Sequence, residues 1–181
     1  MKRTAIKTRE RLLLAATRVI LDEGIQQMTL ESVANAAGVS KGGLLYHFPS
    51  KDALIEGMVD YFLEKFEGRL TAHLADEPEP DANTWLRAYI NASSVYEPEE
   101  TAVSSGILAA LTVNPALLKP LHERYRVWQD RLMQTTDPAL ATLIRLALDG
   151  LWFCELTGLA PPEPELREQV LAHLLKLNQK E

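Results

Sequence analysis

The chain has 181 residues, of which 46% are hydrophobic and 24% are charged, and its formal net charge is −6. This composition excludes a disordered chain, and no apolar run approaches the roughly 18 residues of a membrane-spanning helix. A single cysteine, Cys154, excludes an internal disulfide. We therefore expect a cytoplasmic protein without a membrane partner.

The charge is distributed unevenly along the chain. Residues 1–51 contain eight Lys or Arg against four Asp or Glu, a net of +4, whereas residues 52–181 contain eleven against twenty-one, a net of −10. A basic segment beside an acidic remainder favours contact of the basic part with phosphates. Uneven decoration of an ordinary surface is the alternative.

The first helix is predicted from about Thr8 to Glu23, where apolar residues recur at helical spacing and Gly24 follows. Residues 29–51 then read TLESVANAAGVSKGGLLYHFPSK and contain two short helical patterns. Thr29 is the expected N-cap of the first, and Gly38 is expected to end it in the left-handed conformation. Ser40 is expected to cap the second, over about residues 41–48.

Two short helices joined by a tight turn form the helix-turn-helix motif, whose second helix enters the major groove of DNA. Its candidate hydrogen-bond donors are Lys41, Tyr46, His47 and Lys51. Gly42 and Gly43 are unfavourable inside a helix, and their bare backbone favours close approach to a DNA strand. A helical hairpin whose glycines merely allow close packing is the alternative.

Helical patterns continue after residue 51 without strand-like alternation, so an all-α fold is predicted. A long helix is expected from Lys51 to about His73, followed by an acidic linker over residues 76–83. Later helices are expected to start at Pro98, Pro115 and Pro138. Pro120 marks either a kink or the true start of one of them.

Residues 138–158 are apolar over so wide an arc that neighbours must cover them on two sides. An amphipathic segment follows Pro164, so a second copy of the protein is one expected source of the cover. The alternative is that both helices close the core of one protomer. The expected interface residues are Leu148, Leu151, Trp152, Leu171, Leu174 and Leu175.

The sequence contains no recognisable catalytic or metal-binding constellation, because its four histidines are scattered and Cys154 has no partner at an identifiable position. We therefore expect no enzyme, no metal and no cofactor. Aromatic residues concentrated after residue 84 would suit a mainly apolar ligand, although such residues also build ordinary cores. The expected pocket residues are Trp85, Tyr89, Tyr96, Ile107, Leu111, Tyr125, Trp128 and Phe153.

The sequence resembles the TetR family of transcriptional regulators. The resemblance is specific over about residues 8–55 and rests on TLESVANAAGVSKGGLLYHFPSKDAL, which matches the family's head signature in order and spacing. It implies a nine-helix fold that dimerises through its last two helices. It also implies repression that is relieved when a small molecule enters a pocket in the part of the chain that follows the DNA-binding segment, which we call the body.

The resemblance also assigns individual positions. Base edges are expected to be read at the opening of the second helix, by Ser40, Lys41, Gly42 and Gly43. Phosphate contacts are expected at Thr29, His47 and Lys51. Leu45 stands where the family often has a tyrosine, so Tyr46 must replace that phosphate contact or the contact is absent.

The expected function is a homodimeric, sequence-specific repressor that binds a palindromic operator in double-stranded DNA and is released by a small, mainly apolar ligand. An effector-independent DNA-binding protein whose body only dimerises is the alternative. A small helical enzyme is a third reading, for which the sequence offers no acid–base pair. The expected domains are a helix-turn-helix DNA-binding domain over residues 1–51 and a ligand-binding and dimerisation domain over residues 52–181.

Overall fold

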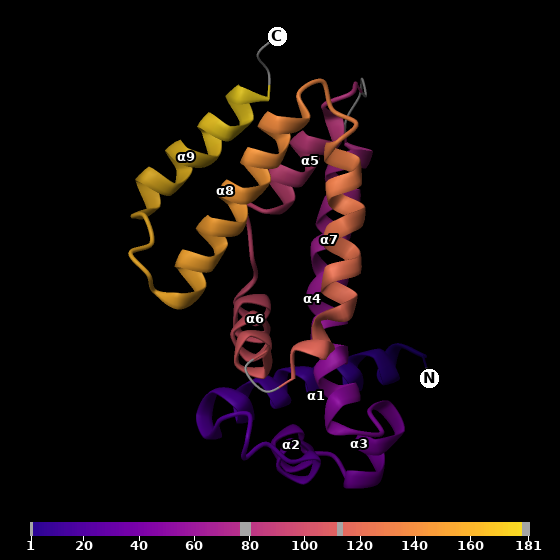
Figure 1. Cartoon of the computed structure of the whole chain (residues 1–181). Helices are drawn as coiled ribbons and strands as arrows, with labels where there is room; N and C mark the ends of the chain where they lie inside the picture. Colours follow the sequence, from indigo (N-terminus) through magenta and orange to yellow (C-terminus); the bar gives the residue numbers. More distant parts are fainter. Residues whose placement is uncertain (1, 77–80, 112–113, 179–181) are drawn as a thin grey trace. The chain divides into compact units, whose positions relative to one another are not determined.

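The computed structural model describes residues 2–76, 81–111 and 114–178. All regular structure within these ranges is helical, which confirms the all-α prediction. The elements in chain order are α1 (Lys2–Glu23), α2 (Leu30–Ala37), α3 (Lys41–His47), α4 (Lys51–Ala75), α5 (Thr84–Ala92), α6 (Pro98–Leu111), the 3-10 turn η1 (Pro115–Leu118), α7 (Lys119–Leu132), α8 (Pro138–Thr157) and α9 (Pro164–Leu177) (Figure 1).

The chain forms two compact units. Unit 1 comprises residues 1–64 and 97–122, and unit 2 comprises residues 65–96 and 123–181, so the division falls inside α4 and α7. Unit 1 thus contains α1–α3 together with α6. Residues 1–51 stay the predicted DNA-binding domain and residues 52–181 the predicted body, because this division does not test which residues bind DNA.

Most helix ends lie where the local sequence signals predict them. α1 ends at Glu23, and Gly24 follows with a φ of 84°. Its start differs, because the helix already begins at Lys2 rather than near Thr8. Pro120 is the second residue of α7, where its missing N–H costs nothing, so it marks a helix start and not a kink.

The core of unit 1 is formed by apolar side chains of α1, α2, α3, α4 and α6. Leu12, Leu13, Leu44 and Met58 are fully buried. α6 approaches α1 closely at Gly106, where an added Cβ would lie 2.8 Å from Met58 Cε and 3.7 Å from Thr17 Cα. A side chain there would displace the flexible end of Met58, whereas its distances to Thr17 would be ordinary van der Waals contacts.

A second close contact fixes the end of α3 against α4. Phe48, which follows α3 directly, is buried to 3% exposure, and its ring lies against Gly57 of α4. A Cβ at Gly57 would lie 2.5 Å from Phe48 Cε1 and 3.3 Å from Leu13 Cδ2. The guanidinium of Arg9 covers the Phe48 ring at 5.5 Å from its centroid. The Phe48 ring therefore occupies the space that a side chain at position 57 would need.

Unit 2 contains α5, which contacts both α8 and α9, and the main part of α7. Its buried apolar residues include Leu86, Ile90, Leu132, Ile144 and Leu148. The caps of α8 are local: Asp137 Oδ1 accepts a hydrogen bond from Leu140 N at 2.9 Å, and Gly158 ends the helix with a φ of 70°. Among the described helices, none is long and apolar enough to cross a lipid bilayer.

Replacing Gly57 with alanine should lower the free energy of unfolding by about 1–3 kcal/mol, because the new methyl group would overlap the wedged Phe48 ring. The matched control is Gly68→Ala on the same helix, where nothing lies within 4 Å and the change should stabilise by up to about 1 kcal/mol. Urea unfolding of both variants checks the pair. Equal effects of the same sign would contradict the tight Phe48–Gly57 contact.

Candidate nucleic-acid interface

The start of α2 is fixed by a reciprocal cap. Thr29 Oγ1 accepts a hydrogen bond from Ser32 N at 3.0 Å, and Ser32 Oγ accepts one from Thr29 N at 3.0 Å. Thr29 itself is extended, with φ −120° and ψ 157°. The exposed Thr29 thus lies at the N-terminus of α2, with its hydroxyl already engaged in the cap.

The turn between α2 and α3 follows from one glycine and one serine. Gly38 adopts a φ of 65°, a left-handed conformation that glycine accepts without steric cost. Ser40 then caps α3, because its Oγ accepts a hydrogen bond from Gly43 N at 3.1 Å. The predicted helix-turn-helix motif is therefore present, with α3 following α2 after a short turn (Figure 1).

The two faces of α3 differ sharply. Leu44 is fully buried, whereas Leu45 is 40% exposed and Tyr46 is 83% exposed. Lys41 and Gly42 are also exposed. The outward face of α3 thus combines a cation, a bare backbone position, an apolar side chain and a phenol.

His47 lies at the end of this face and is half-buried. Its ring packs edge-on against Tyr46, with the ring centroids 5.1 Å apart and an angle of 84° between the planes. The contact restricts how both side chains can turn. The DNA contacts expected of Tyr46 and His47 stay predictions.

Lys41 forms an ion pair with a carboxylate, and the sequence did not predict this pair. Its Nζ lies 3.5 Å from Glu31 Oε2 of α2, and the two side chains are 60% and 70% exposed. An exposed pair of this kind is weak, so Lys41 can leave it at little cost. Glu31 nevertheless places a negative charge beside the outward face of α3.

Lys51 has a different environment from the one expected for a phosphate contact. Its Nζ donates hydrogen bonds to Ile25 O at 2.6 Å and to Met28 O at 2.9 Å. A lysine ammonium has three donors, so one remains for another acceptor. Lys51 therefore holds the loop between α1 and α2 against the start of α4. Sequence reasoning missed this role because nothing local signals a contact 26 residues away.

In unit 2, four of the predicted pocket residues pack together: Trp85, Tyr89, Tyr125 and Trp128. The ring centroids of Trp85 and Tyr89 lie 5.2 Å apart, and those of Tyr125 and Trp128 lie 5.0 Å apart. Phe66 of α4, which was not predicted to line a pocket, joins them at 4.7 Å from Trp128. We call these five residues the aromatic cluster.

Of the other predicted pocket residues, Tyr96 interacts electrostatically with Tyr89 and Tyr125 of this cluster. Tyr96 faces Arg69, whose guanidinium carbon lies 5.2 Å from the ring centroid. Ile107 is buried in unit 1, and Phe153 is 43% exposed on α8. The side chain of Leu111 lies outside the described residues.

A polar network joins α7 to α8 beside the aromatic cluster. Tyr125 donates a hydrogen bond to Asp149 Oδ1 at 3.1 Å, and Arg145 donates one to Asp149 Oδ2 at 2.6 Å. Burial raises the pKa of Asp149 above its ordinary value, although Arg145 and Tyr125 act to lower it. Burial, followed by the Asp149 charge, also raises the pKa of Tyr125. Tyr125 is therefore a neutral hydrogen-bond donor at physiological pH.

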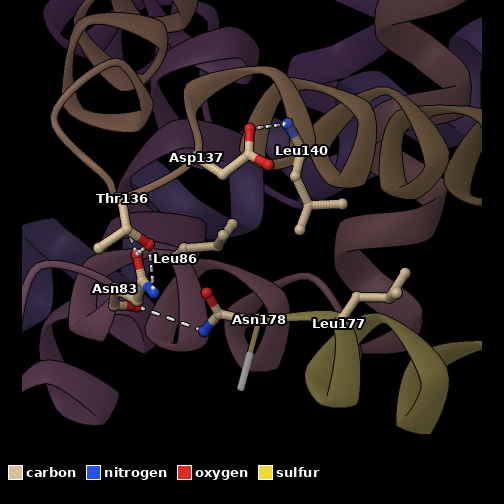
Figure 2. Close-up of a pocket in the computed structure, with 7 residues that line it drawn as sticks. All are labelled: Asn83, Leu86, Thr136, Asp137, Leu140, Leu177 and Asn178. Atoms are coloured by element: carbon tan, nitrogen blue, oxygen red, sulfur yellow. Dashed lines mark hydrogen bonds between the residues drawn. The ribbon is translucent and has the colours of Figure 1, made fainter. Parts of the chain in front are cut away.

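A small hollow in unit 2 has a volume of about 40 Å³, enough for little more than ordered water. Figure 2 shows its lining residues, which are Asn83, Leu86, Thr136, Asp137, Leu140, Leu177 and Asn178. Asn83 Nδ2 donates a hydrogen bond to Thr136 Oγ1 at 2.9 Å, and Asn178 Nδ2 donates one to Asn83 O at 3.4 Å. These bonds tie together the ends of unit 2 elements, and none of the predicted pocket residues takes part.

Within the described part of the chain, no group of three or more His, Cys, Asp or Glu is arranged to hold a metal ion. Comparison with known proteins then identifies the two halves of the sequence. The model described as "Bacterial regulatory proteins, tetR family" matches residues 12–58, and the one described as "Tetracyclin repressor-like, C-terminal domain" matches residues 83–179.

The chain belongs to the TetR family. TetR-family proteins are DNA-binding transcriptional regulators and not enzymes. The HTH-type transcriptional regulator CymR of Pseudomonas putida is 27% identical over 164 residues, which span 86% of this chain and 79% of the relative.

Solved structures show the same fold. A putative TetR-family regulator from Rhodococcus sp. superimposes with a TM-score of 0.73 at 20% identity, covering 96% of this chain and 100% of that one. The multidrug binding protein EbrR complexed with ethidium gives a TM-score of 0.60 at 27% identity, covering 92% and 98%. The described ranges of the chain contain nine α-helices, which confirms the nine-helix architecture that the resemblance implies.

The predicted interface residues of this TetR-family protein differ in how far they are buried within the protomer. Leu148, Leu171 and Leu174 are buried within the protomer, at 3%, 9% and 8% exposure. These three have little area left for a second copy. Leu151, Trp152 and Leu175 are half-buried.

A separate apolar stripe on α8 is exposed, and the sequence did not distinguish it from the buried one. It consists of Ala139, Leu143, Leu146, Gly150 and Phe153. These residues recur at intervals of three and four, so they share one face of the helix. We call them the α8 stripe. An interface on α8 and α9 stays a prediction, and the α8 stripe adds exposed apolar side chains to that surface.

Replacing Lys51 with methionine should lower the free energy of unfolding by about 1–3 kcal/mol, because the carbonyl oxygens of Ile25 and Met28 lose their donor. Lys41→Met is the matched control, since its exposed ion pair should change stability by less than about 0.5 kcal/mol. Chemical denaturation of the two variants measures the difference. A Lys51 variant as stable as the control would show that the loop does not depend on this lysine.

Proposed function

We propose that this TetR-family chain is a homodimeric, sequence-specific repressor. In this proposal α3 of each protomer reads base edges in the major groove of a palindromic operator in double-stranded DNA. A small, mainly apolar effector that binds the body releases the repressor from DNA.

The observation that carries the proposal is the outward face of α3. A helix of seven residues exposes Lys41, Leu45 and Tyr46 while its opposite face is sealed by Leu44. Base edges in the major groove present amino donors as well as acceptors and the thymine methyl, and the latter two suit side chains that donate hydrogen bonds or make apolar contacts. Exposed Thr29 and half-buried His47 flank this face and would position it on the phosphates.

The charge distribution supports the same assignment, in which residues 1–51 contact the DNA. Residues 1–51 carry a net charge of +4, and residues 52–181 carry −10. Phosphate contacts release counterions, so the affinity should fall steeply with salt. Lys41 would leave Glu31 for the DNA, whereas Lys51 has one donor left beyond its two carbonyl oxygens.

The α8 stripe supports dimerisation. Leu143 is 63% exposed, Leu146 is 51% exposed, and Phe153 is 43% exposed. Large apolar side chains in a continuous row are rarely left in water by a stable monomer. Two copies of the stripe related by a twofold axis would bury each other, and the same axis would relate the two α3 helices. Half-sites about 34–36 Å apart would then be bound on one side of the DNA.

The aromatic cluster supports an effector that is mainly apolar. Its rings would offer stacking surfaces, and Tyr125 beside it would offer a hydroxyl. The structural relative EbrR was solved with ethidium, a flat aromatic compound. The sign of regulation is supported by the "Tetracyclin repressor-like" description of the match over residues 83–179.

The second candidate is a dimeric DNA-binding protein that responds to no effector. The dense packing of the aromatic cluster favours it, because centroid distances of 4.7–5.9 Å leave no space between those rings. The two candidates differ in one observable property. A ligand that binds the folded state must raise the melting temperature, so a melt unmoved by a broad panel of aromatic compounds would favour the second candidate.

The direct test of the proposal is selection of binding sites from a random duplex library with the full chain, followed by anisotropy titrations at several salt concentrations. The expected result is a palindromic site bound at sub-micromolar protein with a steep salt dependence. Failure to enrich any sequence, or binding without preference between the selected and scrambled duplex, would overturn it.

Replacing Glu31 with glutamine should tighten binding to the selected duplex by about three- to tenfold, because Lys41 loses its competing partner and the phosphates lose a repelling charge. Glu168→Gln on α9 makes the same change in net charge outside unit 1 and should leave the affinity within about twofold. Anisotropy titrations compare the two. Equal tightening by both variants would mean that only the net charge matters.

Replacing Leu143 with arginine should raise the dimer dissociation constant by at least about 100-fold, because the change removes apolar area and places a cation in each copy of the α8 stripe. Val127→Arg on α7, which is 50% exposed, is the control and should leave the mass unchanged. Light scattering coupled to size exclusion reports the mass of each variant. A Leu143 variant that remains dimeric at low micromolar concentration would exclude the α8 stripe from the interface.

A further inference from the structure

We propose that Leu45 reads the C5-methyl groups of thymine and is a specificity-determining residue of α3. The inference rests on the proposed function, which assigns α3 to the major groove. It goes beyond that function because it states what one position of the operator must contain.

The exposure of Leu45 is the starting observation. Its side chain is 40% exposed, while the adjacent Leu44 is fully buried. The side chain of Leu45 is therefore only partly used in packing, whereas Leu44 and Phe48 supply the fully buried contacts of this segment. An apolar side chain kept outward on this helix is available to a partner that approaches the outward face.

The surroundings of Leu45 leave that approach open. Gly42 lies one turn earlier on the same face, and a Cβ added there would meet no atom within 4 Å. A base edge can therefore come close to the helix backbone at Gly42 and meet the Leu45 side chain without a neighbouring side chain between them. Lys41 and Tyr46 flank this opening and are both exposed.

The chemistry of the groove then selects the base. In the major groove, the thymine C5-methyl is the apolar group that a base pair presents, whereas the remaining edge atoms are hydrogen-bond donors and acceptors. Leucine can satisfy none of those donors and acceptors. Placing it against guanine, cytosine or adenine edges would desolvate polar atoms without compensation, so thymine is favoured at this position.

The position of that thymine relative to the other contacts follows from the helix. Lys41 and Leu45 are four residues apart, which is about 6 Å along the helix axis. Base pairs are stacked about 3.4 Å apart. A lysine commonly donates to guanine O6 and N7, so the half-site should contain a guanine within about two base pairs of the critical thymine.

The test uses the full chain and the duplex that wild-type protein selects from a random library. Each thymine of the selected half-site is replaced in turn by deoxyuridine, which removes only the methyl group, and both half-sites are changed together. For wild type, one such replacement should weaken binding by about fourfold per methyl, or about 15-fold for both half-sites. For Leu45→Ala the same replacement should change the affinity by less than twofold.

Two controls accompany the test. Leu45→Met keeps an apolar side chain of similar size and should retain the sensitivity to deoxyuridine. Val127→Ala shortens an apolar side chain outside unit 1 that is 50% exposed, and it should behave as wild type. Thermal melting should show that Leu45→Ala is folded, with a melting temperature lowered only by the loss of the covered part of the side chain.

Three results would overturn the inference. The first is a selected half-site in which no deoxyuridine replacement weakens wild-type binding by twofold. The second is equal sensitivity of wild type and Leu45→Ala at every thymine, and the third is loss of sensitivity in Leu45→Met. Each leaves the proposed function intact, because wild type still selects and binds a site. Failure of wild type to select any duplex would instead be a failure of the proposed function.

Discussion

The contact between Phe48 and Gly57 is the constraint on which the presentation of α3 depends. A helix of seven residues is too short to be stable by itself, so tertiary contacts must hold it. Leu44 and Phe48 provide these contacts, and Phe48 fits because Gly57 has no side chain in its place. Arg9 covers the Phe48 ring from α1. Three helices thus meet at one ring, and the opposite face of α3 stays free to carry function.

Lys41 and Lys51 have different surroundings, although both side chains carry a positive charge. Lys41 is exposed and held only by a weak pair with Glu31, so it can exchange that partner for DNA. Lys51 directs two hydrogen bonds to carbonyl oxygens of the loop between α1 and α2. In the proposed function Lys41 therefore serves recognition, whereas Lys51 aligns the loop between α1 and α2. In the proposed recognition Leu45 would add an apolar contact, in a position where the family often has a tyrosine.

Sequence patterns predicted the elements that depend on local interactions. The caps at Thr29 and Ser40 and the left-handed Gly38 involve atoms within a few residues, so short motifs specify them. Pairs that form across long sequence distances were not predictable in this way, as Lys51 with Ile25 shows. The apolar arc of α8 was predicted as a whole. The structure shows that the row around Leu148 is buried and the row around Leu143 is exposed. This difference depends on the neighbouring helices, so the sequence pattern alone could not predict it.

The most direct test of the account is hydrogen–deuterium exchange of the full chain with and without its selected duplex. The outward face of α3 is the proposed reading surface, so exchange in residues 29–47 should slow by at least about tenfold when DNA is bound. Residues 164–177 of α9, far along the chain in the other compact unit, should change by less than about twofold. Unchanged exchange in residues 29–47, with protection elsewhere, would contradict the assignment of α3 as the helix that reads DNA.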